Sequence, residues 1–340
     1  MKAYAGIDLH STNNYIGIIN DKAQRLFKKR LPNNLDVILS ALEPFQQDLH
    51  GIVVESTYNW YWLVDGLQDH GYTIHLANPS AIKQYEGLKH TDDRWDSFWL
   101  AHLLRLNILP EGYVYPKEER PVRDLLRRRM MLVRQRATHI LSLQSMITRN
   151  LGINMPGSEI KKLTGDEAEQ LFKDPCLVLA ATNSISIMKF LKEKIRLIEQ
   201  SVLSQVKLRE EFAPLLTLPG IGKILGLTIM LEVDSINPDF VGKVGNYSSY
   251  CRCVKSERLS NGKKKGSGNT KNGNKYLSWA YVEAAHHAKR SYPYAQRFFQ
   301  RKKAQTNGIV AVKALSNKLC RASYYVMRDQ VPFDQEKLFR

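Results

Sequence analysis

The sequence predicts an α/β domain followed by a mainly helical region, and three observations carry this prediction. Short β-branched and aromatic runs open the chain. Amphipathic stretches then alternate with apolar runs up to about residue 106, and long segments with helical spacing fill most of the remainder. At 340 residues the chain is long enough for more than one domain. We expect domains at 1–115, 116–210 and 211–340.

The first domain is expected to contain a mixed β-sheet. Polar turns at 10–13 and 20–21 separate three apolar runs and indicate a meander of three strands. Helix and strand then alternate. The expected strands are 3–9, 14–19, 24–31, 51–55 and 72–76, and the expected helices are 35–45, 58–68, 79–88 and 92–106. This β-β-β-α-β-α-β-α order is that of a ribonuclease H-like, or RuvC-like, domain, in which the first and fourth strands are neighbours.

The second and third domains are expected to be helical. No Gly or Pro occurs between Val122 and Leu151, so a long helix is expected over about 118–151, with a second one over about 185–210. These two would form a helical hairpin or coiled-coil spacer. Beyond them, Pro219-Gly220-Ile221-Gly222 predicts a tight turn that opens a helix, similar to a helix-hairpin-helix. A Gly, Lys and Asn-rich stretch at 260–274 is expected to be a long loop, followed by helices to about residue 326.

The charge of the chain is unevenly distributed. The formal net charge is +17, which excludes an acidic solvating protein and favours a polyanionic partner. Residues 1–100 hold 9 Lys and Arg against 12 Asp and Glu, which gives a net charge of −3. Residues 101–340 therefore carry a net charge of +20. Four cysteines form no disulfide framework, and no apolar run approaches the ~18 residues of a membrane span. We therefore expect a cytoplasmic protein that contacts nucleic acid and no membrane.

Four carboxylates of the first domain are candidate metal ligands. Asp8 interrupts an apolar strand, and Glu55 ends the fourth strand. Asp93 and Asp96 share one face of the helix expected at 92–106, after the fifth strand. Converging carboxylates could hold two Mg²⁺ ions ~4 Å apart, with Mn²⁺ as a substitute. The alternatives are a helix cap for Asp93 and a surface charge for Glu55. Asp92 competes with Asp93 as the ligand.

Basic and glycine residues of the other two domains are candidate nucleic-acid contacts. Arginines interleave with apolar residues along the first long helix, although a merely solvated basic face is the alternative. Backbone N–H groups of the turn at 219–222 could meet a phosphate, the alternative being an ordinary helix–helix turn. The candidate contacts are Arg127, Arg128, Arg134, Gly220, Gly222, Lys223, Lys263, Lys264, Lys265, Lys271 and Lys275.

Several motifs resemble those of the DEDD insertion-sequence transposases. In the first half these are Gly-Ile-Asp-Leu-His at 6–10, Val-Val-Glu-Ser at 53–56 and Thr-Asp-Asp-Arg-Trp-Asp-Ser-Phe-Trp-Leu-Ala at 91–101. In the second half Leu-Pro-Gly-Ile-Gly-Lys at 218–223, Ser-Asn-Gly at 260–262 and Thr-Lys-Asn-Gly-Asn-Lys-Tyr-Leu at 270–277 match further family signatures. The family typically has Gly where Asn261 stands, and Asn also tolerates a positive φ.

The resemblance implies more than the residues alone do. It places the four acidic ligands at Asp8, Glu55, Asp93 and Asp96, and it makes Ser260 a nucleophile that forms a phosphoserine link with DNA. On the residues alone, a serine between lysines is usually a turn residue, and Ser256 and Ser267 are nearby alternatives. The resemblance also implies a bridge-type guide RNA as a partner.

These expectations combine into one hypothesis. The chain would be a DNA transposase or recombinase that works as a homo-oligomer, a dimer or tetramer, in the nucleoid of a bacterium or archaeon. Its partners would be donor and target DNA and a structured guide RNA. The first alternative is a structure-selective endonuclease, similar to a Holliday-junction resolvase, that uses metal-activated water. The second alternative is a nucleic-acid-binding protein without catalysis.

Overall fold

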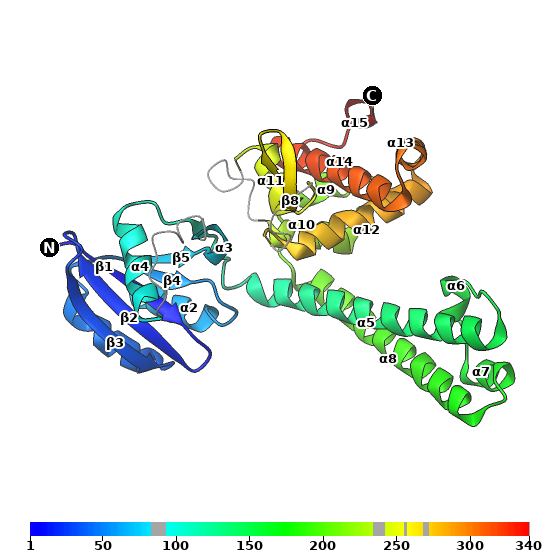
Figure 1. Ribbon diagram of the computed structural model, residues 1–340, viewed down its shortest axis with the longest axis horizontal. Coiled ribbons are helices and arrows are strands. Elements are labelled where there is room, and N and C mark those ends of the chain that lie inside the picture. Colours follow the sequence, from blue (N-terminus) through cyan, green and yellow to red (C-terminus); the bar gives the residue numbers. More distant parts are fainter. Residues whose placement is uncertain (83–92, 234–241, 255–256, 268–271, 340) are drawn as a thin grey trace. The chain divides into compact units, whose positions relative to one another are not determined.

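The computed structural model of the chain describes residues 1–82, 93–233, 242–254, 257–267 and 272–339 (Figure 1). The chain divides into two compact units, Met1–Lys117 and Glu118–Arg340. The segments expected as separate domains at 116–210 and 211–340 are both parts of the second unit, apart from the first two residues. Among the helices in the described ranges, none is long and apolar enough to cross a membrane.

The first unit is built on a six-stranded mixed sheet with the strand order β3-β2-β1-β4-β5-β6. β1, β2 and β3 form an antiparallel meander, β4 and β5 continue the sheet in parallel with β1, and β6 pairs antiparallel with β5. The strands are β1 (Ala3–Leu9), β2 (Asn13–Asn20), β3 (Arg25–Pro32), β4 (Leu49–Glu55), β5 (Ile74–Ala77) and β6 (Glu111–Gly112). The expected contact between the first and fourth strands is confirmed.

Helices cover both faces of this sheet. On one face α1 (Leu35–Leu42) and α2 (Tyr61–Asp69) pack on alternate side chains of β1, β2 and β4, which form the main core of the unit. On the other face α4 (Asp93–Arg105) packs on the intervening residues of the same strands. The short elements η1 (Glu43–Phe45) and α3 (Pro79–Ile82) complete the described part, and most of the helix expected at 79–88 lies outside it.

Two long antiparallel helices open the second unit. α5 (Arg120–Leu151) and α8 (Pro175–Gln205) run side by side, and α6 (Gly157–Ile160) and α7 (Gly165–Leu171) join their far ends (Figure 1). A small core of apolar residues from these four helices closes that end of the pair. The expected helical hairpin is therefore present. α8 begins ten residues earlier than the apolar spacing predicts, because Asp174 caps it and Pro175 occupies its first turn.

The remainder of the second unit is a helical bundle with one β-hairpin. α10, α12 and α14 contribute most of its core. The elements are α9 (Phe212–Leu215), α10 (Lys223–Glu232), α11 (Val244–Tyr250), β7 (Glu257–Ser260), β8 (Lys263–Ser267), α12 (Lys275–Ser291), α13 (Pro293–Gln305), α14 (Gly308–Asp329) and α15 (Gln335–Phe339). The expectation of one long loop at 260–274 is wrong for its first half, because residues 257–267 pair as the antiparallel hairpin β7–β8.

Candidate catalytic and nucleic-acid-binding sites

Asp8 and Glu55 occupy matching positions on neighbouring parallel strands. Ile7 pairs with Val54, so Asp8 and Glu55 are the next residues along β1 and β4. Ile7 and Val54 both point into the core under α1 and α2. Because side chains alternate along a strand, Asp8 and Glu55 face the other side of the sheet, where α4 lies. The register therefore places the positions of Asp8 and Glu55 side by side at the ends of β1 and β4, and their role as metal ligands stays a prediction.

Two glycines determine how closely α4 approaches that face. A Cβ atom on Gly6 would lie 1.9 Å from the carbonyl oxygen of Ser97, and one on Gly17 would lie 2.8 Å from Ser97 Oγ. At the other end of the helix, a Cβ on Gly51 would lie 3.1 Å from Leu104. α4 therefore runs antiparallel to β1, and its N-terminal end lies toward Asp8. Asp96 directly precedes Ser97, so it belongs to this end.

Asp8 lies in a buried environment. Its exposed fraction is 4%, and Nε2 of His10 lies 3.2 Å from its Oδ2. A buried carboxylate needs compensation by hydrogen bonds, positive charge or a cation. Carboxylate oxygens are ligands that suit Mg²⁺, so Asp8, Glu55 and Asp96 fit that ion by donor type. The side chain of Asp93, like all of Asp92, lies outside the described atoms, and among the described side chains no three acidic, His or Cys residues converge on one metal position.

Ser260 lies at the turn of the hairpin β7–β8. It pairs with Lys263 across a two-residue turn formed by Asn261 and Gly262, whose φ angles are +51° and +72°. Two consecutive positive φ angles are the mark of a type I′ turn, for which Asn-Gly is the preferred sequence. Ser260, Lys263 and Lys265 are exposed, so the serine hydroxyl stands next to positive charge. Ser256 and Lys271 and the side chains of Lys264 and Ser267 lie outside the described atoms.

The start of α12 is held by a buried polar network. Asn274 caps α12, since its Oδ1 accepts hydrogen bonds from the N–H groups of Tyr276 and Leu277. Its Nδ2 donates to Glu232 Oε2 at 2.7 Å. Gly273 precedes it with φ +83°, and a Cβ there would lie 2.4 Å from the carbonyl oxygen of Tyr250. The Gly-Asn pair is therefore required by packing and by capping at once.

Glu232 also receives two arginines from the long helix α5. Arg127 donates from Nε at 2.6 Å and from Nη2 at 2.8 Å, and Arg123 donates from Nε at 3.3 Å. The guanidinium of Arg127 stacks 4.4 Å above the ring of Tyr276. Arg127, expected as a nucleic-acid contact, is thus already engaged within the protein. Arg128 and Arg134 are exposed on the same helix.

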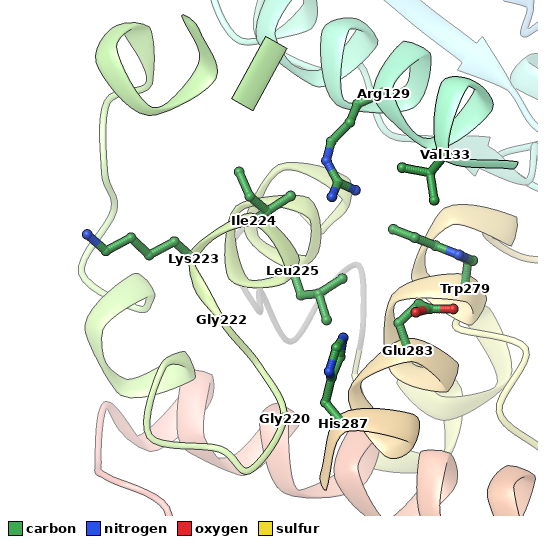
Figure 2. Close-up of a pocket in the computed structure, with 10 residues that line it drawn as sticks. All are labelled: Arg129, Val133, Gly220, Gly222, Lys223, Ile224, Leu225, Trp279, Glu283 and His287. Atoms are coloured by element: carbon green, nitrogen blue, oxygen red, sulfur yellow. The ribbon is translucent and has the colours of Figure 1, made fainter. Parts of the chain in front are cut away.

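The turn at 219–222 borders a pocket of about 380 Å³ between α5, α10 and α12 (Figure 2). Gly220 has φ +80°, and a Cβ on it would lie 2.1 Å from the carbonyl oxygen of Ala284, so packing on α12 requires a glycine here. Gly222 caps α10 without a side-chain hydrogen bond, and its surroundings are open. The first N–H groups of α10 therefore lack an intrahelical acceptor. Lys223 is exposed and extends away from the other pocket residues.

Comparison with known protein families decides the identity of the chain. A family model described as a transposase, of the DEDD-type IS110 group, matches residues 5–150. A second model, described as the transposase IS116/IS110/IS902 family, matches residues 213–300. The chain is an IS110-type transposase. No curated protein matches it. The two matched segments contain the four acids and Ser260, respectively, and DNA is the partner that transposase families act on.

The pocket contains transposase residues that were not among the predicted site residues. Trp279, Glu283 and His287 lie four residues apart on α12 and line one wall of the pocket (Figure 2). Arg129 lines the pocket from α5, with its guanidinium 6.0 Å from the ring centre of Trp279, and it also pairs with Glu199. The signal that could have indicated this wall is the i, i+4, i+8 spacing, which places an indole, a carboxylate and an imidazole on one helix face. No comparable signal marks Glu232, because its partners are distant in the sequence.

Proposed function

We propose that this transposase cuts and rejoins DNA through Mg²⁺-binding carboxylates in the first unit and the Ser260 hydroxyl in the second. The observation that carries the proposal is the alignment of Asp8 with Glu55 on the face of the sheet where the N-terminal end of α4 lies. The strand order and the meander-first connection support a ribonuclease H-like assignment for this unit. In such a sheet, acids at neighbouring strand ends are placed to share a cation.

The carboxylates would act on the scissile phosphate. Asp8, Glu55, Asp93 and Asp96 would hold Mg²⁺, which when bound neutralises the charge on phosphate oxygens during displacement. The burial of Asp8 keeps bulk water from screening this charge. His10, 3.2 Å from Asp8, would hold the orientation of the Asp8 carboxylate.

Ser260 would supply the nucleophile. Its Oγ would form a bond to the phosphorus while the bond from phosphorus to the leaving DNA oxygen breaks, and the serine proton would pass to that oxygen. A free hydroxyl of another DNA strand would then displace Oγ and regenerate the serine. Exposure at a hairpin turn and the neighbouring Lys263 and Lys265 support this role, because lysine charge stabilises both the serine oxyanion and the phosphate.

Two substitutions test the proposal. Asp8→Asn should abolish strand cleavage and leave DNA affinity within a factor of two, because only the metal-binding charge is removed. Ser260→Ala should abolish the protein–DNA adduct that survives denaturation. Asp36→Asn, which removes an exposed carboxylate from α1, is the matched control and should cleave normally. Unchanged cleavage by Asp8→Asn would show that these acids do not bind a catalytic metal.

The alternative reaction is hydrolysis by metal-activated water, as in a junction-resolving nuclease. The two reactions leave different products, since hydrolysis yields free ends and a serine attack yields a covalent adduct. A Ser260→Ala protein that still cleaves would establish the nuclease reaction. If the wild-type protein binds DNA but does not cleave it with any metal ion tested, the protein binds nucleic acid without catalysis.

Strand exchange between two DNA molecules also requires more than one protomer. α8 supports this, because apolar Ile187, Phe190 and Leu197 are exposed by 39%, 57% and 43% along a helix that already packs on α5. Apolar residues at such spacing suit contact with a second copy. Light scattering should give a dimer or tetramer, and Phe190→Glu should shift the protein toward the monomer.

A structured guide RNA would be bound by the basic second unit, and purified protein should then carry one ribonuclease-sensitive RNA of discrete length.

A further inference from the structure

One long stretch of the second unit carries positive charge without any acid. Residues 284–328 contain ten Lys and Arg and no Asp or Glu. They cover the end of α12, the whole of α13 and nearly all of α14. Within this stretch only His287 lines the pocket at the 219–222 turn, and no residue of the stretch belongs to the hairpin β7–β8. The cations of this stretch therefore form a basic surface that shares no residue with the nucleic-acid contacts proposed above.

Part of this charge converges on one aromatic ring. The guanidinium of Arg301 on α13 lies 6.0 Å from the Phe298 ring centre, and Nζ of Lys318 on α14 lies 5.3 Å from it. Lys318 also donates to the carbonyl oxygen of Leu338 at 2.7 Å. Burial, Arg301 and Arg321, in that order, lower the pKa of Lys318. Arg301 and Lys318 at the Phe298 ring, together with Arg321, three residues after Lys318 on α14, are called the Phe298 cluster.

A second group of cations lies at the adjacent ring. Nζ of Lys289 lies 4.6 Å from the centre of the Phe299 ring. Its pKa is lowered by burial first and then by Arg290 and Lys303. Like charges from α12 and α13 are thus held together here as well. Their mutual repulsion opposes folding, so a bound anion would relieve a cost that the free protein carries.

Two ordinary explanations do not account for the Phe298 cluster. Cations in the last turn of a helix interact favourably with the helix dipole, which explains Lys302 and Lys303 but not Lys318 and Arg321 in the middle of α14. Surface cations are usually balanced by acids nearby. Among the described residues, Arg301 and Arg321 form no ion pair with any carboxylate.

We propose that the Phe298 cluster binds the phosphate backbone of a nucleic-acid duplex. Arg301 and Arg321 are exposed and carry donors that match phosphate oxygens in pairs. Phe298 restrains Arg301 and Lys318 at its ring, so these two side chains lose less freedom when phosphate binds. The inference rests on the proposed function only in that a nucleic acid is the partner, and DNA and RNA share this backbone.

The test compares duplex affinity over a range of salt concentrations. The probes are a fluorescent DNA duplex and an RNA duplex of the same sequence and length, with binding followed by anisotropy on the full chain. The Arg301→Ala and Arg321→Ala double variant should bind at least about tenfold more weakly, and its log–log salt slope should fall by about two, one for each lost phosphate contact. A loss of affinity for the DNA duplex or for the RNA duplex supports the proposal, and the duplex that shows the loss is the one that the cluster binds.

The matched control removes two exposed cations elsewhere in the same unit, with Lys189→Ala and Arg196→Ala on α8. It should keep wild-type affinity and slope. Equal losses in the two double variants, or a wild-type slope in the Arg301 and Arg321 variant with both duplexes, would overturn the proposal. Thermal unfolding of each variant excludes misfolding. Because the assay needs no cleavage, an inactive wild-type protein would contradict the proposed function and leave this comparison valid.

Discussion

The side chains of Asn274 and Glu232, 42 positions apart, meet in the interior of the second unit, where Asn274 Nδ2 donates to Glu232 Oε2 at 2.7 Å. Asn274 simultaneously caps α12, and Glu232 simultaneously accepts from Arg123 and Arg127 of α5. One contact therefore connects the long helix, the end of α10 and the start of α12. The start of α12 is anchored through it.

Removal of the Asn274 side chain should destabilise the second unit more than an ordinary cap deletion. Asn274→Ala loses the cap and one buried donor to Glu232, and should cost about 2 to 4 kcal/mol. Asn307→Ala is the matched control, because Asn307 caps α14 through Val310 N–H at an exposed site and should cost about 1 kcal/mol. Denaturant unfolding monitored by circular dichroism measures both. Equal losses would show that the contact with Glu232 contributes little.

Neutralisation of Glu232 should leave buried arginine charge without its counterion. The side chains of Glu232 and Arg123 are 2% and 8% exposed, so Glu232→Gln should cost about 3 to 5 kcal/mol. Glu199→Gln provides the comparison, since Glu199 pairs with Arg129 at a site where its side chain is 30% exposed. That change should cost less than about 1 kcal/mol. The same unfolding assay applies, and a small effect at Glu232 would mean that the arginines find other acceptors.

The two glycines of the 219–222 turn should respond differently to alanine. Gly220→Ala places a Cβ 2.1 Å from a backbone oxygen of α12 at φ +80°, and should cost about 3 kcal/mol or more. Gly222→Ala has open space and a φ of −90°, and should cost less than about 1 kcal/mol. Thermal melting separates the two. A lower affinity for DNA in the stable Gly222→Ala protein would indicate that the start of α10 contacts phosphate.

Binding of Mg²⁺ to the first unit should be measurable without any cleavage assay. A ligand that binds only the folded state stabilises it, by about 2.7 kcal/mol at a hundredfold excess over its dissociation constant. Mg²⁺ or Mn²⁺ should therefore raise the first unit's melting temperature in the wild type and not in Asp8→Asn. Asp36→Asn should behave as the wild type does. Equal shifts in all three proteins would mean that the cation binds elsewhere.

The sequence predicted the first unit better than the second for a physical reason. Apolar alternation in β1, β2 and β4 is local, and it determines both the strands and the face each side chain takes. The hairpin β7–β8 contains only Leu259 as an apolar residue, so its pairing depends on the Asn261-Gly262 turn instead of on burial. Contacts such as Glu232 with Asn274 depend on the packing of whole helices, which periodicity does not predict. In the candidate site, the register places Asp8 beside Glu55, and the role of the acids as metal ligands stays a prediction. Arg127, expected to contact nucleic acid, bonds to Glu232 instead, and the α12 wall of the pocket was not among the predicted contacts.

The turn beside Ser260 allows the geometry of the proposed nucleophile to be tested apart from its chemistry. Asn261 has φ +51°, a conformation that glycine adopts freely and that costs alanine about 1 to 2 kcal/mol. Asn261→Gly should therefore keep adduct formation at the wild-type rate. Asn261→Ala should reduce it by about 5- to 30-fold, because the hairpin that presents Ser260 forms less often. Adduct yield on denaturing gels measures the rate, and Ser260→Ala provides the baseline. If the alanine and glycine variants react equally fast, the position of Ser260 at this turn does not control its reactivity.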